Sequence, residues 1–217
     1  MPDDETDVVH LVDLVRKGYN ALSYRYRSDD ADDGRYAPWL AALHNRLPAR
    51  AAVLDLGCGC GVPVARSLVA AGHQVTGVDV SEVQIGRARG LVPTAAFIRA
   101  DATKIEFAAG SFDAVVCLYA MIHMPLAAQP ALIGRIARWL RPRGWLLMTV
   151  GQSAWTGSEQ GWLGGNAVMW WSQSDAASYA RWVDQAGLEI VEQSFVPEDD
   201  GGHALFWARR PGGSCPA

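Results

Sequence analysis

Long apolar runs are missing from this 217-residue sequence, and no stretch approaches the roughly 20 residues that a helix needs to cross a membrane. The N-terminus, Met1 to Glu5, is acidic and lacks the basic region and apolar core of a secretory signal. Positive charge is also scarce, because 19 Lys and Arg face 23 Asp and Glu, for a net charge of -4. A nucleic-acid partner usually needs a basic face. We therefore expect a cytoplasmic protein with no membrane and no nucleic-acid partner.

Cysteine is infrequent as well. The four cysteines, Cys58, Cys60, Cys117 and Cys215, follow no metal-binding spacing, and Cys58 lies too close to Cys60 for an ordinary disulfide. Reduced thiols are the simplest interpretation. No pair of histidines or acidic residues has convincing ligand spacing either, so we predict no metal site.

From residue 51 onward, short apolar runs alternate with helical segments, which indicates βαβ units and a parallel sheet. We expect strands at 52–56, 74–80, 95–99, 112–118, 145–150, 188–196 and 204–209. We expect helices at 8–19, 36–47, 64–71, 82–89, 129–140 and 175–186. The segment 152–173 has no clean period. The predicted organisation is a helical cap (1–50), one α/β domain (51–210) and a disordered tail (211–217).

A glycine-rich turn follows the first expected strand and gives the strongest motif, Asp55-x-Gly57-x-Gly59-x-Gly61. Glycine allows positive φ and lets the backbone lie against a ligand. A dinucleotide fingerprint would need G-x-G-x-x-G, but Val62 stands at its last position. The pattern therefore favours another nucleotide cofactor.

Acidic residues end the next two strands. Asp79 follows Gly61 by eighteen residues and is suited to accept hydrogen bonds from two ribose hydroxyls; Asp101 is suited to accept one from an adenine amino group. Either acid alone is equally well a helix cap or a turn residue. Their occurrence after successive strands, together with the glycine turn, predicts one nucleotide site.

With these motifs the sequence resembles the class I methyltransferases that use S-adenosylmethionine (SAM), over about residues 19–209. The resemblance assigns cofactor binding to Asp55, Gly57, Gly59, Gly61, Asp79, Val80, Asp101, Ala102 and Leu118. Leu140 to Leu146 resembles the family's L-x-P-G-G turn, with Arg143 in place of the first glycine. The resemblance implies a doubly wound, seven-stranded, mostly parallel sheet whose last strand is antiparallel, under an N-terminal helical cover. It also implies that Tyr19 and Tyr26 contact the carboxylate of SAM or pack on it.

The substrate is expected at the loop after the fourth strand. His123 is the candidate general base, because its unperturbed pKa lies near neutrality, and Tyr119 is a second catalytic candidate. A histidine that merely orders this loop is the alternative interpretation. Aromatic side chains after the fifth strand suit a flat or cationic substrate. These expected substrate contacts are Trp155, Trp162, Met169, Trp170 and Trp171, with Glu159 and His203 as weaker polar candidates.

These observations predict transfer of a methyl group from SAM to an oxygen or nitrogen atom of a small molecule, leaving S-adenosylhomocysteine. A specialised natural product or a modified peptide is the expected substrate class, and a monomer or homodimer the expected state. Two alternatives stay open: a SAM-binding protein that transfers no methyl group, and a nicotinamide-dependent oxidoreductase.

Overall fold

The computed structural model describes residues 4–32, 34–198 and 201–212. Its helices are α1 (Asp4–Tyr26), α2 (Ala37–His44), α3 (Val64–Ala70), α4 (Glu82–Leu91), α5 (Gln129–Trp139) and α6 (Ala176–Gln185). Its strands are β1 (Ala52–Leu56), β2 (Gln74–Asp79), β3 (Ala96–Arg99), β4 (Phe112–Cys117), β5 (Leu140–Gly151), β6 (Trp155–Gln160), β7 (Val168–Gln173), β8 (Glu189–Glu198) and β9 (Gly201–Arg209). Of the cysteines, Cys58, Cys60 and Cys117 are buried free thiols, and Cys215 lies outside the described residues.

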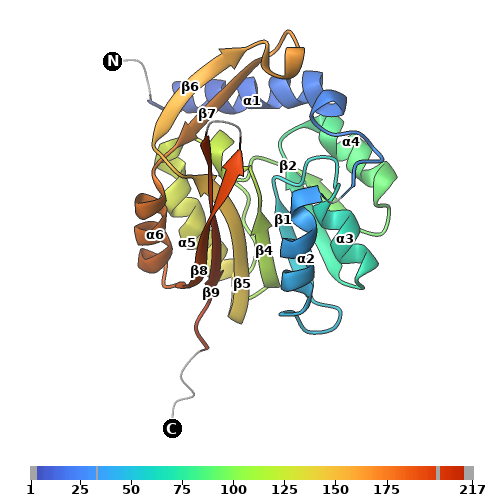
Figure 1. Ribbon diagram of the computed structural model, residues 1–217, viewed down its shortest axis with the longest axis vertical. Coiled ribbons are helices and arrows are strands. Elements are labelled where there is room, and N and C mark those ends of the chain that lie inside the picture. Colours follow the sequence, from blue (N-terminus) through green and yellow to red (C-terminus); the bar gives the residue numbers. More distant parts are fainter. Residues whose placement is uncertain (1–3, 33, 199–200, 213–217) are drawn as a thin grey trace.

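Seven strands form one sheet in the order β3-β2-β1-β4-β5-β9-β8 (Figure 1). The pairs within β3-β2-β1-β4-β5 are parallel, whereas β9 runs antiparallel to both β5 and β8. The sequence prediction of a doubly wound, mostly parallel sheet is thereby confirmed. Strand order reverses beside β1, where β4 lies on the opposite side from β2, and open α/β sheets bind ligands at such a point.

The sheet is covered on both faces. One hydrophobic cluster packs α5 and α6 against the strands, and a second packs α2, α3 and α4 against the other face. This double burial explains why β4 reads as an uninterrupted apolar run: Ala114, Val115, Val116 and Cys117 are fully buried. The polar groups that follow each strand therefore gather at the carboxyl edge of the sheet.

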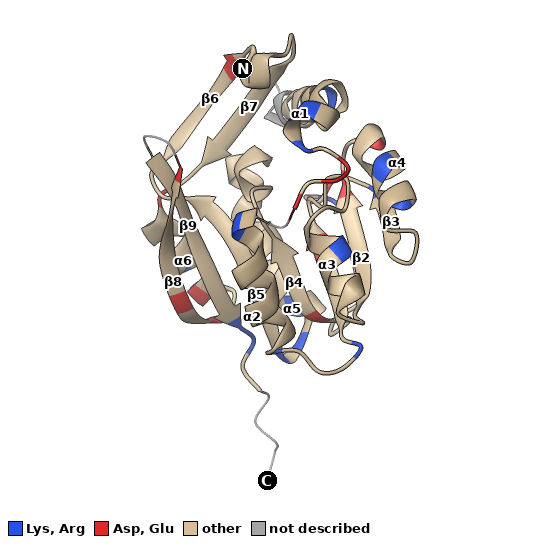
Figure 2. Ribbon diagram, turned by 45° about the vertical axis from the view of Figure 1, so that its right-hand side comes forward, with Lys and Arg blue, Asp and Glu red and all other residues tan. Residues whose placement is uncertain are grey.

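The segment after β5 corrects the sequence prediction, which saw no regular structure there. β6 and β7 form a separate two-stranded antiparallel hairpin. The alternation that marks a half-buried strand is lost because both faces of β7 are covered: Met169, Trp170 and Ser172 are all buried. Figure 2 shows this hairpin beside α1 and almost without charged residues.

Helix α1 is longer than the predicted helix 8–19 and lies across the carboxyl edge of the sheet (Figure 1). Polar contacts attach it to α4: the Ser23 hydroxyl donates to Gln84 Oε1 over 2.8 Å. The buried Arg87 donates to the Ser23 carbonyl and, over 2.5 Å, to Asp29. Since charged hydrogen bonds are most valuable when buried, this network fixes α1 as a roof over the edge. None of the described helices is both long and apolar enough to cross a membrane.

Candidate cofactor and substrate site

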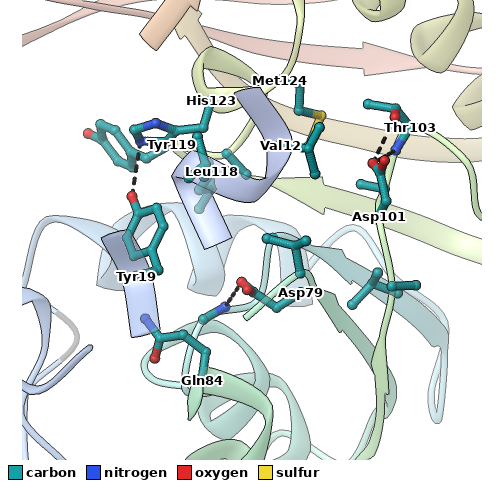
Figure 3. Close-up of a pocket in the computed structure, with 18 of the residues that line it drawn as sticks. Val12, Tyr19, Asp79, Gln84, Asp101, Thr103, Leu118, Tyr119, His123 and Met124 are labelled. Atoms are coloured by element: carbon teal, nitrogen blue, oxygen red, sulfur yellow. Dashed lines mark hydrogen bonds between the residues drawn. The ribbon is translucent and has the colours of Figure 1, made fainter. Parts of the chain in front are cut away.

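A cavity lies beneath α1 at the carboxyl ends of the first four strands (Figure 3). It comprises about 690 Å³ of empty space, including the part open to solvent. Its walls come from the glycine turn, from the ends of β2, β3 and β4, and from α1. Predicted cofactor residues on these walls are Tyr19, Tyr26, Gly57, Gly59, Asp79, Val80, Asp101, Ala102 and Leu118. The structure therefore brings together the glycine turn, the two strand-end acids and the loop after β4.

The glycines of the turn serve different purposes. All three of Gly57, Gly59 and Gly61 have positive φ, at 79°, 53° and 78°. A Cβ on Gly57 would lie 2.2 Å from the Cβ of Ala120, whereas one on Gly59 would meet nothing nearer than 3.8 Å. Gly61 lines neither this cavity nor its neighbour and packs against the core instead, because a Cβ there would meet Phe97 at 3.2 Å. Gly59 is the position at which bare backbone faces the cavity.

Asp79 is held rigidly at the floor of the cavity. Its Oδ2 accepts a hydrogen bond from the Gly59 amide over 2.9 Å, and its Oδ1 accepts one from the Ser81 amide over 2.8 Å. Burial raises the pKa of this carboxyl to about 6, although the backbone amides favour its charged form. Each carboxylate oxygen keeps a second lone pair, so both are suited to accept hydroxyl hydrogen bonds.

Asp101 lies across the cavity from Asp79 (Figure 3). Its Oδ1 accepts from the amide and the hydroxyl of Thr103, over 2.8 and 2.7 Å. These contacts hold the turn after β3, which is the structural role that the sequence leaves open. No described residue donates a hydrogen bond to Oδ2, so Asp101 both shapes the turn and offers an acceptor to a ligand.

Asp55 is the most unusual acid of the site. It is only 2 % exposed, and its Oδ2 has no hydrogen-bond partner among the described residues. Burial and the nearby Asp79 raise its pKa to about 8. An unpaired buried carboxyl is costly unless a ligand supplies a donor or a positive charge. Asp55 borders a small cavity beside the glycine turn that Tyr26 and Arg27 also line.

The predicted base, His123, is enclosed by two hydrogen bonds. Its Nδ1 lies 2.8 Å from the Trp170 carbonyl, which only accepts, so Nδ1 carries the proton. Its Nε2 then accepts from the Tyr19 hydroxyl over 3.0 Å (Figure 3). Burial lowers the pKa of His123 to about 4, so the ring is neutral at pH 7. Since the one available lone pair is already occupied, this geometry favours a role in positioning Tyr19.

A second cavity, of about 1020 Å³ including its open part, adjoins the first. Four residues line both cavities: Tyr19, Tyr26, Tyr119 and His123. The further walls are Arg27, Asp32, Gly34, Arg35, Tyr36, Ile122, Trp162, Trp171, Glu198 and His203. A ligand in the second cavity therefore meets a ligand in the first at these four shared side chains.

The predicted substrate residues divide into two groups. Trp162 and Trp171 line the second cavity, with ring centroids 5.5 Å apart. Met169 and Trp170 line neither cavity and pack against α1 and its neighbours. Trp155 lines neither cavity, is 49 % exposed, and has its ring centroid 5.9 Å from that of Trp171 at an interplanar angle of 48°.

Tyr119 is strained at the boundary of the two cavities. It has a positive φ of 59°, which is uncommon for a residue with a large side chain. Its amide donates to the buried Thr149 hydroxyl over 2.6 Å, which holds the strained conformation. Burial raises the pKa of Tyr119 to about 12, so the phenol is neutral at pH 7. Strain of this kind is concentrated at functional sites.

Several site residues escape sequence reasoning. Gln84 is buried on the cavity wall, while Arg27, Arg35, Tyr36 and Glu198 line the second cavity. Arg35 and Glu198 form an ion pair across 163 positions of sequence. No motif or spacing signals such a pair, because the turn η1 (Gly34–Tyr36) and the end of β8 meet only through the fold.

Comparison with known proteins agrees with this geometry. Residues 53–144, from β1 to the turn inside β5, match the family model of a methyltransferase domain. This segment belongs to the class I SAM-dependent methyltransferase family. The recognition from sequence is thus confirmed, and SAM is the cofactor that defines this family.

Three similar proteins illustrate the range of the family. The methyltransferase GfsG of Streptomyces halstedii is 33% identical over 171 residues, which cover 72% of this chain and 60% of GfsG. The fold also matches the [4+2]-cyclase SpnF, with a TM-score of 0.73, 20% identity and coverage of 93% and 97% of the two chains. The 1,6-didemethyltoxoflavin-N1-methyltransferase of Burkholderia thailandensis, solved with that compound and S-adenosylhomocysteine bound, gives a TM-score of 0.72 at 22% identity, covering 94% and 90%. The chain spans between a quarter and 60% of the first curated relatives that it matches.

Proposed function

We propose that this methyltransferase-family chain binds SAM in the first cavity and transfers its methyl group to an oxygen or nitrogen atom of a small molecule held in the second. The observation that carries the proposal is the junction of the two cavities at Tyr19, Tyr26, Tyr119 and His123. A transfer reaction needs two ligands in contact, and this molecule provides two adjoining cavities. A natural product or a modified peptide is the substrate class that we favour, as in the sequence analysis.

The residues of the first cavity fit SAM. Asp79 offers fixed acceptors for ribose hydroxyls, Asp101 an acceptor for the adenine amino group, and Gly59 a bare backbone surface. The unpartnered Asp55 borders the small adjacent cavity at the glycine turn, where a cationic group of the ligand would satisfy it. When bound, SAM supplies an electrophilic methyl group on a positively charged sulfur.

The remaining contribution of the chain is placement. Tyr19, held by His123, and Tyr119, held by Thr149, fix the walls between the two ligands. Holding an acceptor atom about 3 Å from the methyl carbon is the main requirement of an in-line displacement. Helix α1 and the hairpin β6–β7 contribute Tyr19, Tyr26 and Trp171 to the walls of the site.

Calorimetric titration with SAM and with S-adenosylhomocysteine tests the cofactor half. We expect micromolar binding of both ligands to the wild type. Binding should be much weaker in Asp79→Ala, because the ribose hydroxyls lose their acceptors. Binding should be near normal in the control Asp113→Ala, because Asp113 lies near the start of β4 and the cavity lies at the end of that strand. Absence of binding to the folded wild-type protein would refute the proposal. A nicotinamide cofactor in the same titration tests the oxidoreductase alternative.

A second candidate remains because the same fold occurs in the [4+2]-cyclase SpnF. Fold alone does not establish the chemistry, and a SAM-bound chain that transfers no methyl group would have the same cofactor cavity. Incubation with SAM labelled in its methyl group separates the two candidates. Label recovered in a small-molecule product supports methyl transfer, whereas substrate conversion without incorporated label supports the alternative.

A further inference from the structure

A polar cluster on the wall of the second cavity has no part in the function proposed above. His203 Nδ1 lies 3.1 Å from Glu198 Oε2, and the other oxygen of Glu198 accepts from Arg35. Arg35 also donates to the Tyr119 hydroxyl over 3.3 Å. Nδ1 of His203 has no well-aligned acceptor among the described residues, and this Glu198 oxygen is the carboxylate oxygen within its reach.

The position of His203 suits contact with a substrate. It pairs with Gly151 where β9 begins and β5 ends, at the same edge of the sheet as the cofactor cavity. Its ring lies edge-on to Tyr119, with centroids 5.0 Å apart, and Tyr119 lines both cavities. The side chain is 15% exposed, so a ligand in the second cavity reaches it.

Burial keeps His203 in its neutral form at pH 7. Burial lowers its pKa most, Glu198 opposes this shift, and Arg35 adds to it. The remaining titratable side chains that face it, Tyr119 and His123, are themselves neutral at pH 7. With the Nδ1 proton directed to Glu198, the lone pair of His203 lies on Nε2. No described residue is hydrogen-bonded to that nitrogen, whereas the corresponding lone pair of His123 is occupied by Tyr19.

We propose that His203, oriented by Glu198, is the general base of methyl transfer, and that the acceptor is the hydroxyl of a flat phenolic or enolic compound. This inference rests on the function proposed above and names its base and substrate class. His203 is the catalytic residue in this arrangement, and Glu198 is a positioning residue.

The walls of the second cavity support this substrate class. Trp162, Trp171 and Tyr36 present aromatic faces, which suit a planar ligand. Arg27 also lines the cavity; it is hydrogen-bonded to the Tyr36 hydroxyl and has no carboxylate partner among the described residues. Asp32 lines the same cavity, so Arg27 and Arg35 balance Asp32 and Glu198, and a neutral hydroxyl compound suits these walls better than a charged one. A hydroxyl must also lose its proton during methyl transfer, and a neutral imidazole can accept that proton.

The reaction balances with these groups alone. The hydroxyl oxygen forms a bond to the methyl carbon while the carbon–sulfur bond breaks and leaves its electron pair on sulfur. The hydroxyl proton passes to His203 Nε2, so the positive charge lost by the sulfonium appears on the imidazolium. That proton is then released to water through the open side of the cavity.

Binding of a matched pair of probes tests the contact without requiring turnover. 2-Naphthol and 2-methoxynaphthalene differ only in the hydroxyl proton, and their binding to protein saturated with S-adenosylhomocysteine is followed by tryptophan fluorescence. We expect the naphthol to bind about 5- to 10-fold more tightly, which corresponds to one hydrogen bond. The preference should disappear in His203→Phe and persist in His10→Phe, a control at an exposed position of α1.

Two further readouts separate catalysis from a structural role. Nitrogen NMR of the imidazole rings should show His203 protonated on Nδ1, with a pKa that falls in Glu198→Gln because its raising partner is lost. Methyl transfer to 2-naphthol should lose about 100-fold or more in rate in His203→Phe, and the acid limb of its pH profile should vanish.

The outcomes distinguish this inference from the proposed function. Failure of S-adenosylhomocysteine to bind the wild type refutes the proposed function. Normal S-adenosylhomocysteine binding with an unchanged naphthol preference in His203→Phe refutes the base. If His203→Phe does not fold, Glu198→Gln decides: an unaltered pKa of His203 together with an unaltered pH profile overturns the assignment.

Discussion

Cofactor affinity should depend on pH through Asp79, and the size of the effect follows from the structure. Burial raises the pKa of Asp79 to about 6 in the protein without ligand. Hydroxyl donors favour the charged carboxylate, so the ligand selects the deprotonated form and binding releases a proton. About nine-tenths of the carboxyl is charged at pH 7 and about one-tenth at pH 5, so affinity should fall about tenfold between them.

Titration calorimetry with S-adenosylhomocysteine at pH 5, 6 and 7, in buffers of different ionisation enthalpy, measures both affinity and proton release. In Asp79→Asn the amide cannot titrate, so affinity at pH 7 should be lower than in the wild type and independent of pH over this range. Both proteins are compared in an Asp55→Asn background, because the pKa of Asp55 is raised to about 8 and pairing of its charged form with a cationic ligand group would add a dependence of the same sign. An affinity that is flat from pH 5 to 7 in the wild type, or equally steep in Asp79→Asn, would refute the reasoning.

Three further predictions concern stability. Gly57→Ala should lower the free energy of unfolding by about 2–4 kcal/mol, and the control Gly72→Ala by about 1–2 kcal/mol. Both glycines have positive φ, but only the new Cβ at position 57 would collide with Ala120. Equal losses of stability in denaturant unfolding would contradict this reasoning. His123, whose pKa falls from 6.5 to about 4 on folding, takes up protons on unfolding, so the wild type should lose up to ~3 kcal/mol of stability as pH falls from 7 to 4. His123→Phe should lose correspondingly less, and parallel pH curves would exclude this cause. Arg143→Gly should stabilise the protein by about 0.5 kcal/mol, since Arg143 has a φ of 67°; a lower melting temperature would argue that its side-chain contacts matter more.

The parts of the fold that the sequence predicts are those determined locally. Buried strands such as β4 are continuous apolar runs, and the parallel order follows from alternating strands and helices. The sequence did not predict the hairpin β6–β7, because the apolar residues of β7 contact both α1 and the second cavity. Met169 and Trp171, on one face of β7, reach α1 and the second cavity, and Trp170 on the other face is buried as well, so the strand lacks the alternation of a half-buried one.

The candidate site also contains residues that the sequence predicts and residues that only the fold brings together. Gly57 and Gly59 can be recognised because their backbone conformations exclude most other residues, and Asp79 because it ends a strand. These constraints act within a few residues, so they leave a motif. The base His203 and its partner Glu198 need only stand at the right end of two antiparallel strands, and many residue types could occupy those positions without disturbing the sheet. The role of these two residues depends on their neighbours in the second cavity. It can be recognised only in the folded structure, where the strands, the turn at Arg35 and the strained Tyr119 come together. A substrate site that is built in this way can change its chemistry while the cofactor site beside it stays the same, which is consistent with the variety of reactions among proteins of this fold.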